Sequence, residues 1–450
     1  MVNDLTNGNI HKKLWLFSIP MLISVMFQQI YNIADSMIAG IFAGEDALAA
    51  VGASYPITML FMAVAIGSNT GCSVVISQLF GAKDYKDMKT AINTTFFVCF
   101  LLSIILTGLG FLFCNPLMKL IHTPDNIFVD GKLYLTIYVA GFLFLFLYNV
   151  CTGIFNALGD SRTPLYFLIF SSIGNIILDL LFVAVFHWGV AGVAFATFLA
   201  QGISGILSFF TLQKRLKGIK IEGKPAKYSS KMLIRVAKIA IPSILQQSFV
   251  SVGNMFIQTY VNSFGSAAIA GYSAAIKLNT FAITSFTTLA NGLSSFAAQN
   301  IGARKRERVR KGLFSGLLLA FLVAVPFFIL YFFFGNRMMS LFLKPSEAGN
   351  AIKIGKEFLT IASPFYFIAA IKLMCDGLLR GAGMMAGFMS STFTDLLLRV
   401  ILAGFFSGNF IKNLSYGITG IWMAWPVGWS ISMVISIIFT WYLFKKNRDS

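Results

Sequence analysis

Twelve long apolar runs dominate the pattern of hydrophobic and polar positions along the chain. Each run has about 20 or more mainly apolar residues, the length of a helix that crosses a bilayer. The predicted spans are residues 14–40, 47–80, 91–114, 128–155, 163–186, 190–213, 233–264, 268–301, 311–335, 353–379, 385–407 and 416–443. The pattern therefore predicts an all-α polytopic membrane protein with twelve transmembrane helices, several of them long enough to tilt or kink.

The second half of the chain repeats landmarks of the first half at offsets of 222, 221 and 228 residues. The matched landmarks are Ile19-Pro20 with Ile241-Pro242, Gln78-x-x-Gly-Ala-Lys83 with Gln299-x-x-Gly-Ala-Arg304, and Gly189-Val-Ala-Gly192 with Gly417-Ile-Thr-Gly420. Six spans per half give both halves the same direction, so we expect two six-helix lobes related by a pseudo-two-fold axis along the membrane normal. The predicted lobes are residues 1–213 and 232–450, joined by a solvated basic linker, residues 214–231.

The chain has a net charge of +18, with 57% hydrophobic and 12% charged residues. Such a positive charge could indicate a nucleic-acid-binding protein, but the positions of the basic residues relative to the membrane explain it differently. One side of the predicted membrane carries Lys12, Lys13, Lys83, Lys86, Lys89, Arg162, the basic residues of 214–235 and 304–311, Arg380, and Lys445 to Arg448; the other carries only Lys119, Lys132, Arg337, Lys344, Lys353, Lys356 and Lys412. By the positive-inside rule, both termini of this cell-membrane protein are cytoplasmic. The excess charge therefore reflects topology, and no nucleic-acid partner is expected.

Two aspartates interrupt the apolar runs of the first half. An aspartate at mid-membrane depth costs about 2.5–3.5 kcal/mol, so Asp179 needs a partner or a function. Asn175 lies one helical turn earlier on the same face. At 1.5 Å per helical residue, Asp35, Asp179 and Thr197 all fall about 8–10 Å below the outer surface. We interpret them as one buried site for a proton or a hard cation such as Na⁺; the alternative is that Asp179 only bonds a neighbouring helix.

The repeat provides an internal control for this site. Ile257 matches Asp35, and Ala403 matches Asp179, so the second half lacks the acid pair. Its own predicted buried charges are Lys277, Lys372, Asp376, Asp395 and Arg399. The last four form opposite-charge pairs at i,i+4 that can neutralise each other, whereas Lys277 has no such partner. The ion chemistry is therefore expected in the first half.

Three motifs resemble the multidrug and toxin extrusion (MATE) family, with the bacterial DinF-like branch most similar. They are Tyr31-Asn-Ile-Ala-Asp35, Gln299-Asn-Ile-Gly-Ala303 and Leu158-Gly-Asp-Ser-Arg-Thr-Pro164. The resemblance implies a cation site made of Asp35, Asn175, Asp179 and Thr197, and a drug cavity lined at Tyr31. Asn32, Asn149 and Lys277 are further candidates for the cavity. One departure is that no acid follows Ile241-Pro242, where some members carry a glutamate.

The resemblance implies a transporter rather than an enzyme. It would export organic, cationic or amphipathic drugs or toxins in exchange for inward Na⁺ or H⁺, by alternating access, as a monomer with no cofactor besides the coupling ion. A flippase for a lipid-linked saccharide of the same superfamily is the nearest alternative. A second alternative is an intramembrane protease, since Gly202-Ile-Ser-Gly205 has the G-x-S-G pattern of rhomboid proteases. A serine nucleophile would need a base nearby. Packing of helices through small residues also explains the pattern.

Overall fold

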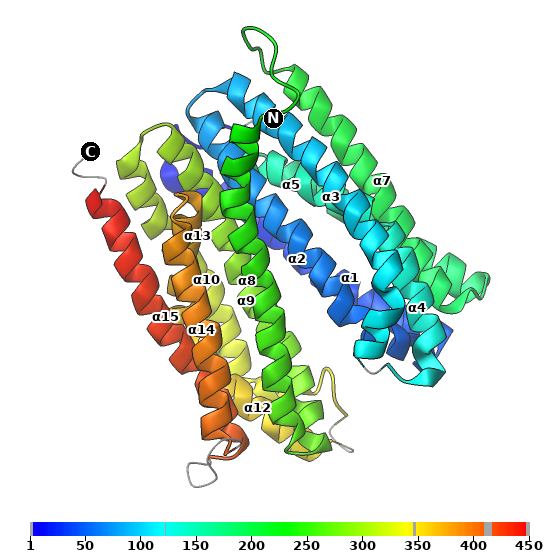
Figure 1. Cartoon of the computed structure of the whole chain (residues 1–450). Coiled ribbons are helices and arrows are strands. Elements are labelled where there is room, and N and C mark those ends of the chain that lie inside the picture. The colour runs from blue at the N-terminus through cyan, green and yellow to red at the C-terminus, as the bar shows by residue number, and fades with distance from the viewer. Residues whose placement is uncertain (1–2, 122, 345–347, 409–415, 447–450) are drawn as a thin grey trace. The chain divides into compact units, whose positions relative to one another are not determined.

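The computed structural model describes residues 3–121, 123–344, 348–408 and 416–446. Lys412 and Arg448, which contributed to the predicted charge asymmetry, lie outside the described residues. Regular structure in the described part is helical throughout (Figure 1). The first half contains α1 (Ile10–Ile38), η1 (Ala39–Ala43), α2 (Glu45–Gly81), α3 (Tyr85–Leu120), α4 (Asp125–Ala140), α5 (Phe142–Ala157), α6 (Arg162–Asp179), η2 (Leu180–Val185) and α7 (Gly189–Lys217).

The second half has a closely similar order of helices. It contains α8 (Ser230–Asn262), α9 (Ser266–Gly302), α10 (Arg306–Phe333), the short α11 (Gly335–Met339), α12 (Gly349–Ala362), η3 (Ser363–Phe365), α13 (Tyr366–Gly381), α14 (Met385–Phe406) and α15 (Ile418–Lys446). The elements η1 and η2 are π-helical, and η3 is a 3₁₀ turn containing Pro364.

The predicted spans are confirmed by these helices. Ten helical segments are long and apolar enough to cross a membrane, and α4 with α5 makes an eleventh, bent by 48° at Gly141. The remaining predicted span, 268–301, corresponds to the 37-residue α9, whose Ser, Thr and Asn content lowers its hydropathy. The described residues therefore hold the twelve spans of the predicted all-α membrane fold.

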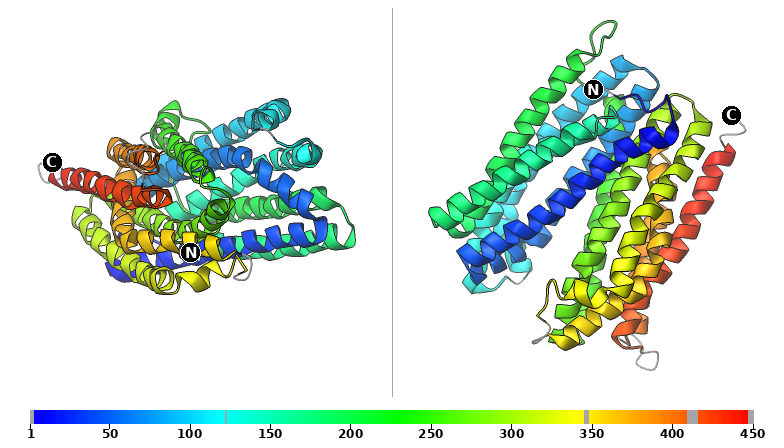
Figure 2. Two further views of the ribbon diagram at one scale, coloured as in Figure 1. Left: turned by 90° about the horizontal axis from the view of Figure 1, so that it is seen from below. Right: turned by 180° about the vertical axis from the view of Figure 1, so that it is seen from behind.

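Contacts divide the chain into two compact units. Unit 1 is Met1–Leu5, Ile23–Ser248 and Gly302–Arg304; unit 2 is Thr6–Leu22, Phe249–Ile301 and Lys305–Ser450. The long helices α1 and α8 each contribute to both units, which the lobe boundaries at 213 and 232 did not anticipate. In unit 1, α5 packs against α2, α3 and α7; in unit 2, α14 and α15 lie side by side, as both sets of views show (Figures 1 and 2).

The backbone confirms the internal repeat. Left-handed residues recur at matched places: Gly44 with Gly265, Lys83 with Arg304, Gly159 with Gly383, and Gly189 with Gly417. Lys83 (φ 60°) and Arg304 (φ 58°) are the most informative pair, because a side chain in this conformation costs about 1–2 kcal/mol. Both halves keep a strained basic residue at the end of their second helix, 221 residues apart, so the two halves share backbone geometry as well as sequence landmarks.

The basic linker differs from the predicted solvated tether. Because α7 extends to Lys217 and α8 begins at Ser230, the linker is only residues 218–229. It is held against α3: the Lys89 ammonium donates to the Ile219 carbonyl at 2.7 Å, and the Asn93 amide donates to the Ala226 carbonyl at 3.0 Å. The linker is therefore part of the folded surface of unit 1.

Candidate functional site

The two aspartates of unit 1 lie where α-helix gives way to π-helix. Asp179 is the last residue of α6, directly before η2, and Asp35 lies one turn before η1. The segments η1 and η2 contact each other. Short π-helical segments are rare and occur often at functional sites. Their contact brings together two acids from distant parts of the chain.

The predicted ion-site residues form one cluster in unit 1. Asp179 and Asn175 are 0% and 1% exposed, and the carboxyl groups of Asp179 and Asp35 face each other closely enough to interact. The Asn175 amide donates to the Thr197 hydroxyl at 3.4 Å. The Tyr31 hydroxyl lies within hydrogen-bonding reach of Thr197 and beside both carboxyl groups. The structure thus brings together the four residues selected from sequence, and their role as ion ligands stays a prediction.

Oxygen acceptors outnumber donors in this cluster. Asp35 Oδ1, Asn175 Oδ1 and both carboxyl oxygens of Asp179 are buried and accept no hydrogen bond from the described residues. Buried acceptors without a donor are costly. A proton or a cation would satisfy them, and carboxylate and amide oxygens are ligands of hard cations. No group of three His, Cys, Asp or Glu side chains suited to a metal occurs in the described part of the chain. The donors of the cluster are oxygens without a thiolate or an imidazole, a set that suits Na⁺ or H⁺.

Tyr134 is a cluster residue that the sequence analysis missed. Its hydroxyl is close enough to Asp35 and Asp179 to interact with their carboxyl groups. Its side chain packs against Ile38 and Val183, next to the two π-helical segments. A tyrosine within an apolar span has no local feature that distinguishes it from a packing residue. Only the fold reveals that α4 belongs to the site.

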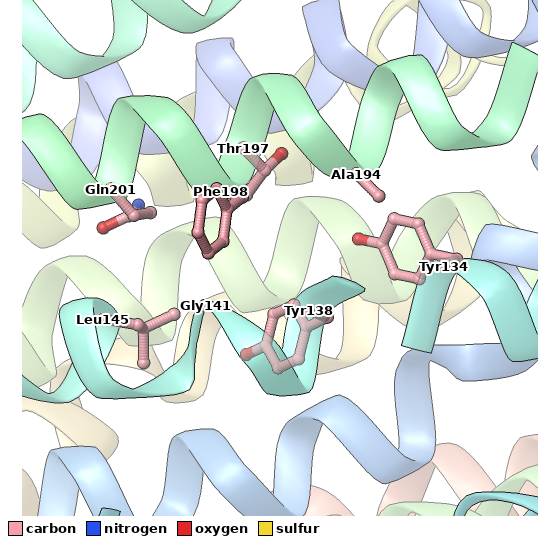
Figure 3. Close-up of a pocket in the computed structure, with 8 residues that line it drawn as sticks. All are labelled: Tyr134, Tyr138, Gly141, Leu145, Ala194, Thr197, Phe198 and Gln201. Carbon is pink, nitrogen blue, oxygen red and sulfur yellow. The ribbon is translucent and has the colours of Figure 1, made fainter. Parts of the chain in front are cut away.

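A small cavity adjoins the cluster at the break between α4 and α5 (Figure 3). Tyr134, Tyr138, Gly141 and Leu145 line it on one side, and Ala194, Thr197, Phe198 and Gln201 of α7 line the other. Its volume of about 10 Å³ is the space of about one water molecule. Thr197 and Tyr134 belong to both the cavity and the acid cluster. The cavity therefore places a small space directly beside the acid cluster, within unit 1.

Asn32, Asn149 and Lys277, the further candidates for the drug cavity, do not share one site in the structure. Asn149 donates to the Leu145 carbonyl of its own helix at 2.9 Å, and Asn32 is exposed. Lys277 belongs to unit 2 and is exposed, so the prediction that it is buried was wrong. Its ammonium lies 5.9 Å from the centre of the Phe342 ring, a contact that needs no carboxylate partner.

The two predicted i,i+4 pairs of unit 2 neutralise each other, as predicted. Lys372 lies 2.9 Å from Asp376, and Arg399 lies 2.8 Å from Asp395. The two pairs also join, because Lys372 is 3.8 Å from Asp395. Ser436 donates to Asp376 at 2.6 Å. Unit 2 therefore carries a charge-compensated network, in contrast to the acids of unit 1.

The protease interpretation finds no support in the structure. Ser204 is fully buried in α7, and its hydroxyl has no hydrogen-bond partner among the described residues. A serine without a base is not activated as a nucleophile. The Gly205 position instead allows α7 to approach α5, since a Cβ there would lie 2.8 Å from the Phe144 carbonyl oxygen. Helix packing explains the G-x-S-G pattern.

Comparisons with known proteins agree with the fold. A family model described as MatE matches residues 20–181 and 242–404. The chain is 30% identical over 383 residues to a probable multidrug resistance protein, YpnP, of Bacillus subtilis, covering 85% of each chain. It is 21% identical over 436 residues to the multidrug export protein MepA of Staphylococcus aureus, covering 96% of this chain and 94% of that protein. A crystal structure of MATE in the straight conformation has a TM-score of 0.91, 21% identity and 99% coverage of both chains.

Proposed function

Because the chain belongs to the MatE family of multidrug efflux transporters, we propose that it is a secondary antiporter whose coupling ion binds in unit 1. The ion is Na⁺ or H⁺, and the ligands are Asp35, Asn175, Asp179 and Thr197. The four buried oxygens without a donor carry this proposal. The exported compounds are proposed to be organic and cationic or amphipathic; the names of the relatives support multidrug export.

The coupling follows from binding linkage. An ion changes a conformational equilibrium only through different affinities for the two conformations. Before ion binding, Asp35 and Asp179 repel each other and leave their oxygens without donors. A bound Na⁺ or proton would draw the two acids, and with them η1 and η2, together. This favours the conformation that releases drug outside, with Tyr31 conveying the state of the acids to the drug-facing side of α1.

The proposed setting is the cell membrane, with both termini in the cytoplasm and the protein acting as a monomer. The distribution of Lys and Arg supports this orientation. Flipping of a lipid-linked saccharide is less well supported, since the paired buried site is acidic and several similar proteins are named for multidrug resistance or export.

Drug uptake into inside-out vesicles, under separately imposed Na⁺ and proton gradients, tests the proposal. Wild-type protein should respond to one of the gradients, and Asp179→Asn should respond to neither while inserting normally. Asp46→Asn is a matched control, because Asp46 is an exposed acid of unit 1 outside the site. Gradient-driven uptake by Asp179→Asn at the wild-type rate would contradict the proposal.

A further inference from the structure

The linker between α7 and α8 is fixed along the first turns of α3 by a series of hydrogen bonds. Besides the contacts of Lys89 and Asn93, the backbone N–H of Ala226 donates to the Thr90 hydroxyl at 3.1 Å, and that of Ser229 donates to the Thr94 hydroxyl at 3.0 Å. Thr90 and Thr94 are themselves buried, at 6% and 1% exposed. Their hydroxyls also donate to the carbonyls of Lys86 and Thr90, one turn earlier in α3, which orients them as acceptors. The linker therefore has a defined place on unit 1.

This arrangement gathers positive charge on one surface, here called the linker shelf. The shelf consists of residues 83–89, which lead into α3 and form its first turn, and residues 218–231, which are the linker and the first two residues of α8. The shelf has seven lysines and three acids in total. The exposed lysines are Lys83, Lys86, Lys220, Lys224, Lys227 and Lys231. The acids are Glu222 and the pair Asp84 and Asp87, of which Asp84 caps α3 by accepting from the Asp87 N–H. The shelf is strongly basic with little internal neutralisation.

The shelf borders the most apolar stretch of α3, which is where lipid headgroups are expected. From Lys89, the first anchoring residue, to Phe97 is about 12 Å of helix. Phe97 is 50% exposed and belongs to the most apolar stretch of α3. Only 11% of the residues in that stretch are buried within the protein, as expected for a lipid-facing helix. Tyr228 of the linker packs edge-to-face on Phe97, with ring centres 5.8 Å apart. Tyrosine is enriched at the membrane interface, where its ring is apolar and its hydroxyl is solvated.

From these observations we propose that the linker shelf binds the anionic phospholipid headgroups of the leaflet that faces it. Lysine ammonium groups held at headgroup depth attract phosphate, and clusters of four to eight basic residues next to a membrane helix are typical of anionic-lipid sites. Tyr228 and Phe97 supply the adjacent contact for the acyl chains. The inference uses the predicted side of the linker and does not depend on ion coupling.

Lipid retained by the purified protein tests this inference without any transport assay. The protein is extracted from equimolar phosphatidylcholine and phosphatidylglycerol, and its bound lipids are counted by native mass spectrometry. Wild type should be enriched in phosphatidylglycerol. The triple variant Lys220→Gln, Lys224→Gln, Lys227→Gln should lose most of the enrichment, since each lysine near the surface contributes about fivefold in affinity. Arg306→Gln, Arg310→Gln, Lys311→Gln is the matched control, with the same loss of charge on α10.

A second pair of variants separates geometry from charge. Thr90→Val with Thr94→Val keeps every lysine but removes both hydroxyl acceptors, and should lower the phosphatidylglycerol enrichment. Thr95→Val should leave it unchanged, because the buried Thr95 hydroxyl has no hydrogen-bond partner among the described residues. Equal enrichment in all variants would overturn the proposal, as would an equal loss in the α10 control. A shelf variant that keeps its enrichment but loses binding to a short RNA would assign the surface to another partner.

Discussion

The Asn175 amide donates to the Thr197 hydroxyl at 3.4 Å, and this contact determines which way the amide faces. With its nitrogen directed at α7, Asn175 presents Oδ1 as a buried acceptor without a donor. The hydrogen bond thereby leaves the amide oxygen free to act as the proposed ligand beside Asp179. In the proposed site, Thr197 would both orient Asn175 and offer its own oxygen.

Thr197→Val should therefore weaken ion binding more than folding. The substitution keeps the shape but removes the hydroxyl that orients Asn175, and loss of an orienting contact typically costs about 10–100-fold in cation affinity. The concentration of Na⁺ or H⁺ that gives half-maximal drug transport measures the change. Ser208→Ala on the same helix is the control, because its buried hydroxyl has no partner among the described residues. Equal ion dependence in wild type and Thr197→Val would exclude Thr197 from the site.

Tyr134→Phe tests the residue that only the fold revealed. Removing this hydroxyl, which interacts electrostatically with Asp35 and Asp179, should alter the ion dependence of transport without changing the amount of inserted protein. Tyr138→Phe is its control, since Tyr138 lines the same cavity one turn away and lies beside Tyr134 and Tyr55, not beside the acids. If both variants have the same effect, the cavity as a whole is responsible and Tyr134 has no special part.

The charge network of unit 2 should act in folding rather than in coupling. Asp395→Asn would leave Arg399 and Lys372 with one carboxylate between them, and breaking a buried pair costs about 3–5 kcal/mol. The amount of inserted protein should fall, and Asp395→Asn with Arg399→Gln should recover much of it. The ion-to-drug coupling ratio in vesicles, normalised to inserted protein, is the second readout. A double variant that inserts well but is uncoupled would show that unit 2 carries ion chemistry.

The backbone at Gly302 lies close to the backbone at Gln78, and a substitution at Gly302 tests whether this contact matters for stability. A Cβ on Gly302 would lie 1.9 Å from the Gln78 carbonyl oxygen, so Gly302→Ala requires a backbone shift and should destabilise the protein by about 1–3 kcal/mol. Gly108→Ala on α3 is the control, because a Cβ there meets nothing within 4 Å. The buried cysteines, such as Cys72 and Cys151, report unfolding through their reaction with a thiol dye on heating. Equal midpoints for the two variants would contradict the packing described here.

Much of the fold could be predicted from sequence because its determinants are local. Apolar run length defines the spans, and the repeated Pro and Gly landmarks mark equivalent turns in both halves. The residues of the candidate ion site could also be identified from sequence, since an aspartate within an apolar run is costly enough to require an explanation.

The features that the sequence did not reveal depend on contacts between distant segments. Ala226 reaches Thr90 across 136 positions, and neither residue type signals that the linker is anchored. The π-helical segment that follows Asp35 has the sequence AGIFA, and the one that follows Asp179 has the sequence LLFVAV. Neither composition distinguishes a π-helix from an α-helix. Lys277 was misplaced because a hydrophobic neighbourhood in sequence does not show which face of α9 is exposed.

The double variant Asp35→Asn with Asp179→Asn removes both acids of the proposed ion site. Drug uptake by inside-out vesicles is measured under a Na⁺ gradient, a proton gradient and no gradient, and normalised to inserted protein. Removing two buried acids should leave insertion intact or improved, and the variant should show the same slow uptake in all three conditions while wild type is accelerated by one gradient. Gradient-driven uptake by the double variant at a rate near that of wild type would contradict an ion site in unit 1.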